Sequence, residues 1–180
     1  MKEYEFIRTE LNYLINLQHT YTTFAFTATF IILGIAFSNK NYYLCLVPVF
    51  LVLTILLKIS SLRKGVARLA AYQIVYKENV LPIKWETRLL GYFEMQRNNK
   101  TIKLGIKNRD LLFLSITCTV IYFISSVKIL DSIHIILFVI AIVFNTLIYW
   151  VQNKCKYTPA LIKAEIINWT KYKNEYENQD

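Results

Sequence analysis

Residues 58–110 read KISSLRKGVARLAAYQIVYKENVLPIKWETRLLGYFEMQRNNKTIKLGIKNRD, and this basic stretch decides how the rest of the chain is arranged. It holds twelve of the 21 lysine and arginine residues but only four carboxylates, so it contributes +8 to the net charge of +9. Four stretches without any charged side chain flank it, namely residues 11–39, 41–57, 111–127 and 132–153. A soluble bundle needs polar surface on every helix, and four such stretches in 180 residues leave too little of it. We therefore expect an all-α membrane protein.

The charge-free stretches predict four transmembrane helices that form two antiparallel hairpins. A seventeen-residue span reaches about 26 Å, slightly short of a hydrocarbon core of about 30 Å, and interfacial tyrosines and a snorkelling Lys40 can close the gap. Placing Lys40 at mid-bilayer would cost about 2.5–3.5 kcal/mol, so the first two spans cannot be one helix. Pro48 is expected to kink the second span. The expected spans are residues 21–37, 41–57, 111–127 and 132–151.

Amphipathic helices are expected outside the spans. Residues 3–20 have apolar side chains three to four positions apart, and they either continue into the first span or lie separately along the lipid headgroups. Thr158 and Pro159 predict the start of a C-terminal helix, because a cap followed by proline is a typical helix beginning. The predicted segments are residues 1–20, 21–57, 58–110, 111–151 and 152–180.

The basic segment itself is expected to contain two helices. The first would begin after Lys58 with Ser60 or Ser61 as its cap and would end at Pro82. The second would be an amphipathic segment around Trp85. Both would lie on the cytoplasmic side of the membrane.

The positions of the cations predict the orientation. Nineteen of the 21 lysine and arginine residues lie before the first span, between the second and third, or after the fourth. The two short turns hold only Lys40 and Lys128. By the positive-inside rule, the termini and residues 58–110 are expected to face the cytoplasm.

The residues that catalysis needs are scarce. His19 and His134 are predicted to lie on opposite sides of the bilayer, and the chain has no glycine-rich phosphate loop, HExxH or GxSxG motif. The spacing of its three cysteines matches neither a disulfide framework nor a metal motif. We therefore expect a protein that is not an enzyme and that has no cofactor and no metal site.

Polar side chains recur at helical spacing within the third and fourth spans. Two interpretations fit this pattern: hydrogen-bonded packing between helices, which is favoured, or a water-accessible pathway that Asn145 and His134 face. The six members of this polar seam are His134, Asn145, Gln152, Ser115, Thr119 and Tyr122.

The cations of residues 58–110 form a second candidate site. Positive charge here can follow from topology and from anionic lipid, at about 1 kcal/mol for each surface cation. It can equally form a binding face for an acidic protein, a nucleotide messenger or nucleic acid. The candidate residues for anion or partner binding are Arg63, Lys64, Arg68, Lys84 and Arg88.

In layout the chain resembles the small multi-span membrane proteins encoded beside bacterial phage-defence systems. These include SLATT and four-span effectors of nucleotide-signalling systems and the membrane accessory proteins of CRISPR loci. The resemblance implies an effector that perturbs or permeabilises the inner membrane when a cytosolic partner or messenger signals infection.

Amphipathic faces that need apolar partners predict a homo-oligomer in the lipid bilayer. The alternative is a non-conducting anchor or sensor that recruits a cytosolic partner through its basic face.

Overall fold

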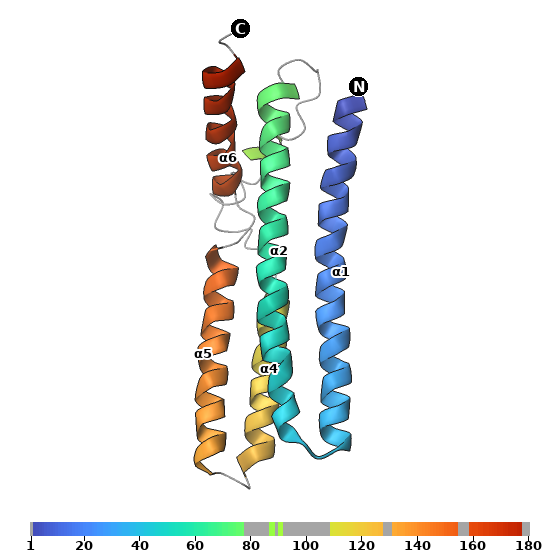
Figure 1. Cartoon of the computed structure of the whole chain (residues 1–180), viewed down its shortest axis with the longest axis vertical. Helices are drawn as coiled ribbons and strands as arrows, with labels where there is room; N and C mark the ends of the chain where they lie inside the picture. Colours follow the sequence, from blue (N-terminus) through green and yellow to red (C-terminus); the bar gives the residue numbers. More distant parts are fainter. Residues whose placement is uncertain are drawn as a thin grey trace. The chain divides into compact units, whose positions relative to one another are not determined.

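The computed structural model describes residues 2–77, 87–88, 90–91, 109–127, 131–154 and 159–177, and all regular structure in these ranges is helical. A 3₁₀ helix, η1 (Tyr42–Leu46), precedes α2, and π-helices η2 (Gln73–Lys77) and η4 (Lys173–Glu177) follow α2 and α6. The all-α prediction is confirmed. The α-helices of the described ranges are α1 (Lys2–Ser38), α2 (Val47–Tyr72), α4 (Asp110–Ser126), α5 (Ser132–Lys154) and α6 (Pro159–Tyr172) (Figure 1).

Three helical stretches are long and apolar enough to cross a membrane. They are Glu3–Ser38, Tyr42–Tyr76 and Ser132–Lys154. Helix α4 is also apolar but has only 17 residues, which corresponds to about 26 Å. By length and hydropathy, the described chain therefore has the helices of a multi-pass membrane protein.

Helix α1 is a single helix of 37 residues, so the N-terminal amphipathic segment and the first predicted span are continuous. The first glycine of α1 is Gly34, and α1 contains no proline. Beyond its end, the amide of Lys40 donates to the carbonyl of Phe37 at 3.2 Å, and the amide of Asn41 donates to that of Ala36 at 3.0 Å. This pair of bonds is a Schellman motif, and Lys40 takes its left-handed position with a φ of 50°.

Helix α2 corrects one sequence prediction. No new helix begins at Ser60 or Ser61, because α2 runs unbroken through both residues. Nothing near Lys58 interrupts its backbone hydrogen bonds, and Ser60 is buried. Pro48 is the second residue of α2, at the point where the 3₁₀ turn of η1 passes into α-helix.

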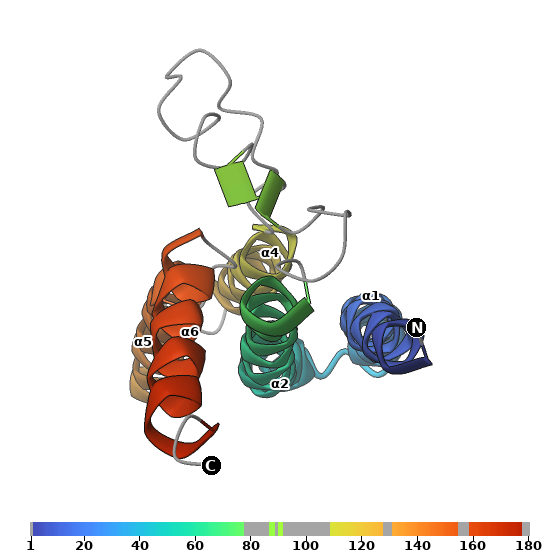
Figure 2. The same ribbon diagram turned by 90° about the horizontal axis from the view of Figure 1, so that it is seen from above.

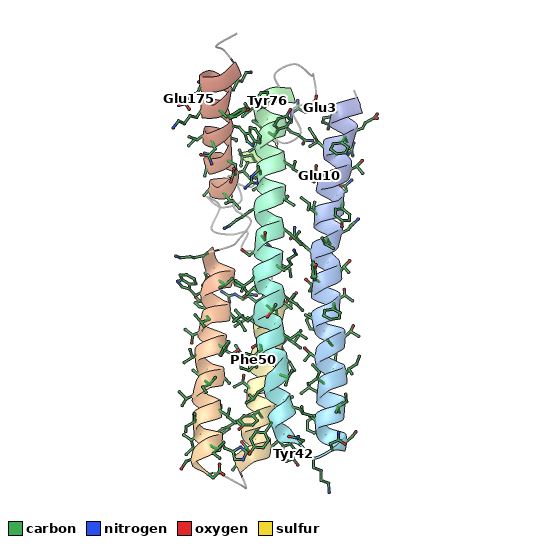
Figure 3. The ribbon with its side chains drawn as sticks, viewed as in Figure 1. Glu3, Glu10, Tyr42, Phe50, Tyr76 and Glu175 are labelled. Carbon is green, nitrogen blue, oxygen red and sulfur yellow. The ribbon has the colours of Figure 1, made fainter. Side chains whose placement is uncertain are left out.

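The chain divides by its contacts into two units, each of which has its own core. One comprises residues 17–60 and 107–155. Its core draws buried side chains from α1, η1, α2, α4 and α5, with Ala25, Val52, Leu114 and Ile148 as examples. Within it, Phe50, labelled in Figure 3, meets the edge of Phe144, with ring centroids 4.5 Å apart. We call this part the apolar unit.

The other unit, which we call the basic unit, comprises residues 1–16, 61–106 and 156–180. Its core joins the C-terminal half of α2 to α6, with Ala67, Ala71 and Ile162 buried together (Figure 2). The predicted start of a helix at Pro159 is confirmed. The segment around Trp85 lies outside the described residues except for residues 87–88 and 90–91.

Candidate functional site

The middle of the polar seam is a short chain of hydrogen bonds between α4 and α5. The Asn145 side-chain amide (Nδ2) donates to the Thr119 hydroxyl (Oγ1) at 2.8 Å and to the Ala141 carbonyl at 3.0 Å. Thr119 in turn donates to the Ser115 carbonyl at 3.0 Å. The side-chain nitrogen of Asn145 thus donates to one group on α4 and to one carbonyl of its own helix, α5. This is the arrangement expected of a packing contact in lipid.

One end of the seam is a cluster of aromatic side chains around His134. The imidazole Nδ1 lies 2.8 Å from the Tyr122 hydroxyl, and Nε2 lies 3.2 Å from the hydroxyl of Tyr43. The Tyr43 ring lies nearly parallel to the imidazole, with centroids 5.0 Å apart. Asp131 caps α5 by accepting the His134 backbone amide at 3.0 Å. We call Tyr43, Tyr122 and His134 the tyrosine–histidine cluster.

The remaining seam residues are also buried in the apolar unit. Ser115 is fully buried near the beginning of α4, and Gln152 is 6 % exposed near the end of α5. The Ser115 hydroxyl and the Asn145 side-chain carbonyl have no hydrogen-bond partner among the described residues. All six predicted seam residues therefore lie on buried or half-buried positions of α4 and α5, and the structure brings Thr119 to Asn145 and Tyr122 to His134.

An open groove of about 420 Å³ runs beside this contact on α4 and α5. Thr119 and Asn145 line it together with apolar side chains such as Leu112, Phe138 and Ile142. Its walls are almost wholly apolar, so the groove suits hydrocarbon rather than water.

The described candidate cations of the basic unit differ in exposure. Lys64 and Arg88 are exposed, and Arg63 is half-buried. Arg68, with 61 % of its side chain exposed, lies 4.0 Å from the Glu165 carboxylate on α6. Lys84 lies outside the described residues. The described part of the chain holds no group of three or more histidine, cysteine, aspartate or glutamate side chains placed to bind a metal ion.

Two groups of interacting residues were missed by the sequence analysis. The first is Tyr43, which was predicted only to anchor the second span at the headgroups. The second is an aromatic contact between α2 and α6, in which the Trp169 ring meets Tyr72 edge-on at 5.1 Å and its indole N–H donates to the Arg68 carbonyl at 3.2 Å. Tyr72 also donates to Glu3, labelled in Figure 3, at 2.7 Å. Tyr76 also meets the Trp169 ring edge-on, at 6.0 Å, and the four-residue spacing of Tyr72 and Tyr76 was the available signal for this contact.

The chain matches no protein-family model, no curated protein and no solved structure. The argument for its function therefore depends on its own residues and their geometry.

Proposed function

We propose that the chain is an oligomeric bacterial inner-membrane effector that perturbs or permeabilises the membrane in response to a cytosolic signal or partner. In this proposal α4 is a fourth span, the spans form two antiparallel hairpins, and both termini and the basic unit are cytoplasmic. The clustering of cations in the basic segment and in the terminal segments supports this orientation. Phage defence is the setting that the layout favours.

The continuity of α1 and α2 carries the proposal. Each helix runs without a break from residues of the basic unit to residues of the apolar unit. A helix held by backbone hydrogen bonds transmits a shift or rotation from one end to the other, whereas a flexible linker does not. A protein that only tethers a partner has no need of two such connections. The two helices therefore support coupling between a cytosolic binding event and the membrane spans.

Pairing within the polar seam supports a resting state that does not conduct. The Asn145 side-chain nitrogen bonds Thr119, and His134 bonds Tyr122, so these groups are engaged within the bundle, whereas the Asn145 side-chain carbonyl and the Ser115 hydroxyl have no partner among the described residues. A water-filled path would require them to turn toward water instead. In the proposed cycle the signal shifts the equilibrium toward such a second arrangement.

Breaking α2 tests the coupling directly. The protein is induced in a bacterium, and membrane potential is followed with a voltage-sensitive dye before and after phage infection. Infection should depolarise cells with the wild-type chain. Ser61→Pro, at an exposed position inside α2, removes a backbone hydrogen bond and costs about 3 kcal/mol of helix stability, so it should abolish the response.

Ser61→Ala is the matched control and should respond as the wild type does. An infected wild-type culture that keeps its membrane potential would contradict the effector proposal. A full response from Ser61→Pro, in a protein still found in the membrane fraction, would contradict coupling through α2.

Cysteine labelling tests the topology. In a background without native cysteines, Asn39→Cys and Ser132→Cys should react with an impermeant maleimide in intact cells. Lys103→Cys should react only after lysis. Labelling of Lys103→Cys in intact cells would reverse the orientation.

The second candidate function is a non-conducting anchor or sensor that recruits a cytosolic partner, and the engaged seam favours it. Among the described residues, the exposed hydroxyls of Thr27 and Thr146 also bond carbonyls of their own helices, as a passive lipid-facing surface requires. An anchor would leave the membrane potential unchanged throughout. Charge reversal at Arg63, Lys64 and Arg68 would then release the partner and leave the chain in the membrane.

A further inference from the structure

We propose that the tyrosine–histidine cluster is a latch that holds the first predicted hairpin against the second in the resting state. The proposal deepens the proposed function and rests on it, because it assigns the contact that must open when the bundle responds. Tyr43 belongs to η1, which follows the turn of the first hairpin. Tyr122 and His134 belong to α4 and α5 of the second. The bond between Tyr43 and His134 spans 91 positions of the sequence and joins the two hairpins.

The imidazole is well suited to hold both tyrosines at once. A neutral imidazole has one N–H donor and one bare nitrogen, and a tyrosine hydroxyl can either donate or accept. Both ring nitrogens of His134 lie within hydrogen-bond distance of a tyrosine hydroxyl, so one hydroxyl accepts and the other donates. The Asp131 cap fixes the backbone of His134 at the beginning of α5. The ring is therefore held from its own helix while it contacts two other elements.

The two hydrogen bonds of the cluster differ in length and burial. The bond within the second hairpin is short, at 2.8 Å, and Tyr122 is fully buried. The bond between the hairpins is longer, at 3.2 Å, and Tyr43 is 47 % exposed. A bond at the protein surface can exchange its partner for water or a headgroup, whereas a buried one cannot. The latch would therefore open between Tyr43 and His134 and leave Tyr122 in place.

Two native thiols lie where they can report this opening. Cys45 is two residues after Tyr43 in η1, and Cys118 is one helical turn before Tyr122 in α4. Both are free and fully buried in the core of the apolar unit. A thiol reacts with maleimide as the thiolate, which requires water. Alkylation of Cys45 or Cys118 would therefore measure how often water enters between the hairpins.

The experiment compares labelling rates in purified protein in lipid vesicles without any signal. The background carries Cys155→Ser, so that Cys45 and Cys118 are the remaining thiols. Tyr43→Phe keeps the stacked ring and removes the hydroxyl. The loss of one hydrogen bond should raise the labelling rate with N-ethylmaleimide about two- to tenfold. Tyr42→Phe, in the adjacent residue of η1, is the matched control and should label at the background rate.

The outcomes separate the latch from the effector proposal. Tyr43→Phe that labels no faster than Tyr42→Phe overturns the latch and leaves the effector proposal standing. Faster labelling in vesicles that retain a trapped dye supports the latch and shows that opening the latch without a signal does not by itself permeabilise the membrane. Faster labelling together with dye release, and depolarisation of uninfected cells by Tyr43→Phe, supports both. His134→Gln, which can still offer a donor and an acceptor, should label between Tyr43→Phe and the background.

Discussion

The apolar unit and the basic unit are both helical, but different interactions hold their helices together. Where α4 meets α5, the polar groups are largely buried, and the side-chain amide of Asn145 bonds Thr119 across the contact. Where α2 meets α6, alanines allow the helices to approach closely, and the Trp169 ring packs against the ring of Tyr72. The first arrangement suits lipid, where an unpaired polar group finds no water. The second suits water, where burial of apolar surface stabilises the contact.

The largest expected effect concerns a buried side chain of the apolar unit. Tyr122→Ala removes a fully buried ring and the hydroxyl that contacts His134. The resulting cavity should lower the free energy of unfolding in detergent by about 3–5 kcal/mol. Ile124→Ala, at a position that is 67 % exposed, is the control. If the two variants unfold alike, Tyr122 is not part of a packed core.

The basic unit should be most sensitive to an increase in side-chain size. Ala71→Leu places three further carbons where α2 contacts Ile162, and overpacking should cost about 1–3 kcal/mol. Chemical denaturation followed by Trp169 fluorescence, in a background with Trp85→Phe and Trp150→Phe, measures this cost. Ala164→Leu makes the same change at an exposed position of α6 and should be nearly neutral. Equal effects of the two substitutions would contradict close packing of α6 on α2.

A smaller loss of stability is expected when a hydrogen bond of the polar seam is removed, if the seam is only a packing contact between helices. Asn145→Leu removes the hydrogen bond to Thr119, and such bonds between membrane helices average about 0.6 kcal/mol. A double-mutant cycle with Thr119→Val in detergent isolates this energy. Thr146→Val, which loses only a bond within its own helix, is the control. Normal stability of Asn145→Leu combined with lost depolarisation would instead assign Asn145 to a water-filled path.

The smallest effect is expected for the exposed ion pair of the basic unit. Arg68 and Glu165 are 4.0 Å apart, and Arg68 is largely in solvent, so their coupling should lie below about 0.5 kcal/mol. The cycle of Arg68→Ala, Glu165→Ala and the double variant measures it by chemical denaturation. A coupling above about 1 kcal/mol would show that charge pairing, and not only packing, holds α6 to α2.

From the sequence, the polar seam could be predicted only as groups of residues that share a helix face. The spacing of Ser115, Thr119 and Asn145 placed them on buried positions, because helical periodicity determines which side chains share a face. It could not show which of them would bond. That choice depends on the rotation and register of α4 against α5, which no local pattern encodes. Tyr43 was missed for the same reason, since its partner His134 is 91 residues away.

The sequence by itself determined that the chain is helical, that its long helices are apolar, and that α6 begins at Pro159. These features follow from local hydropathy, charge and capping chemistry. Only the tertiary structure decided that α2 continues through Ser60 and that Pro48 lies in its first turn. A serine can cap a helix or lie within one, and a proline can kink a helix or begin one. Burial of the surrounding residues selects between these outcomes, and burial is a property of the folded chain.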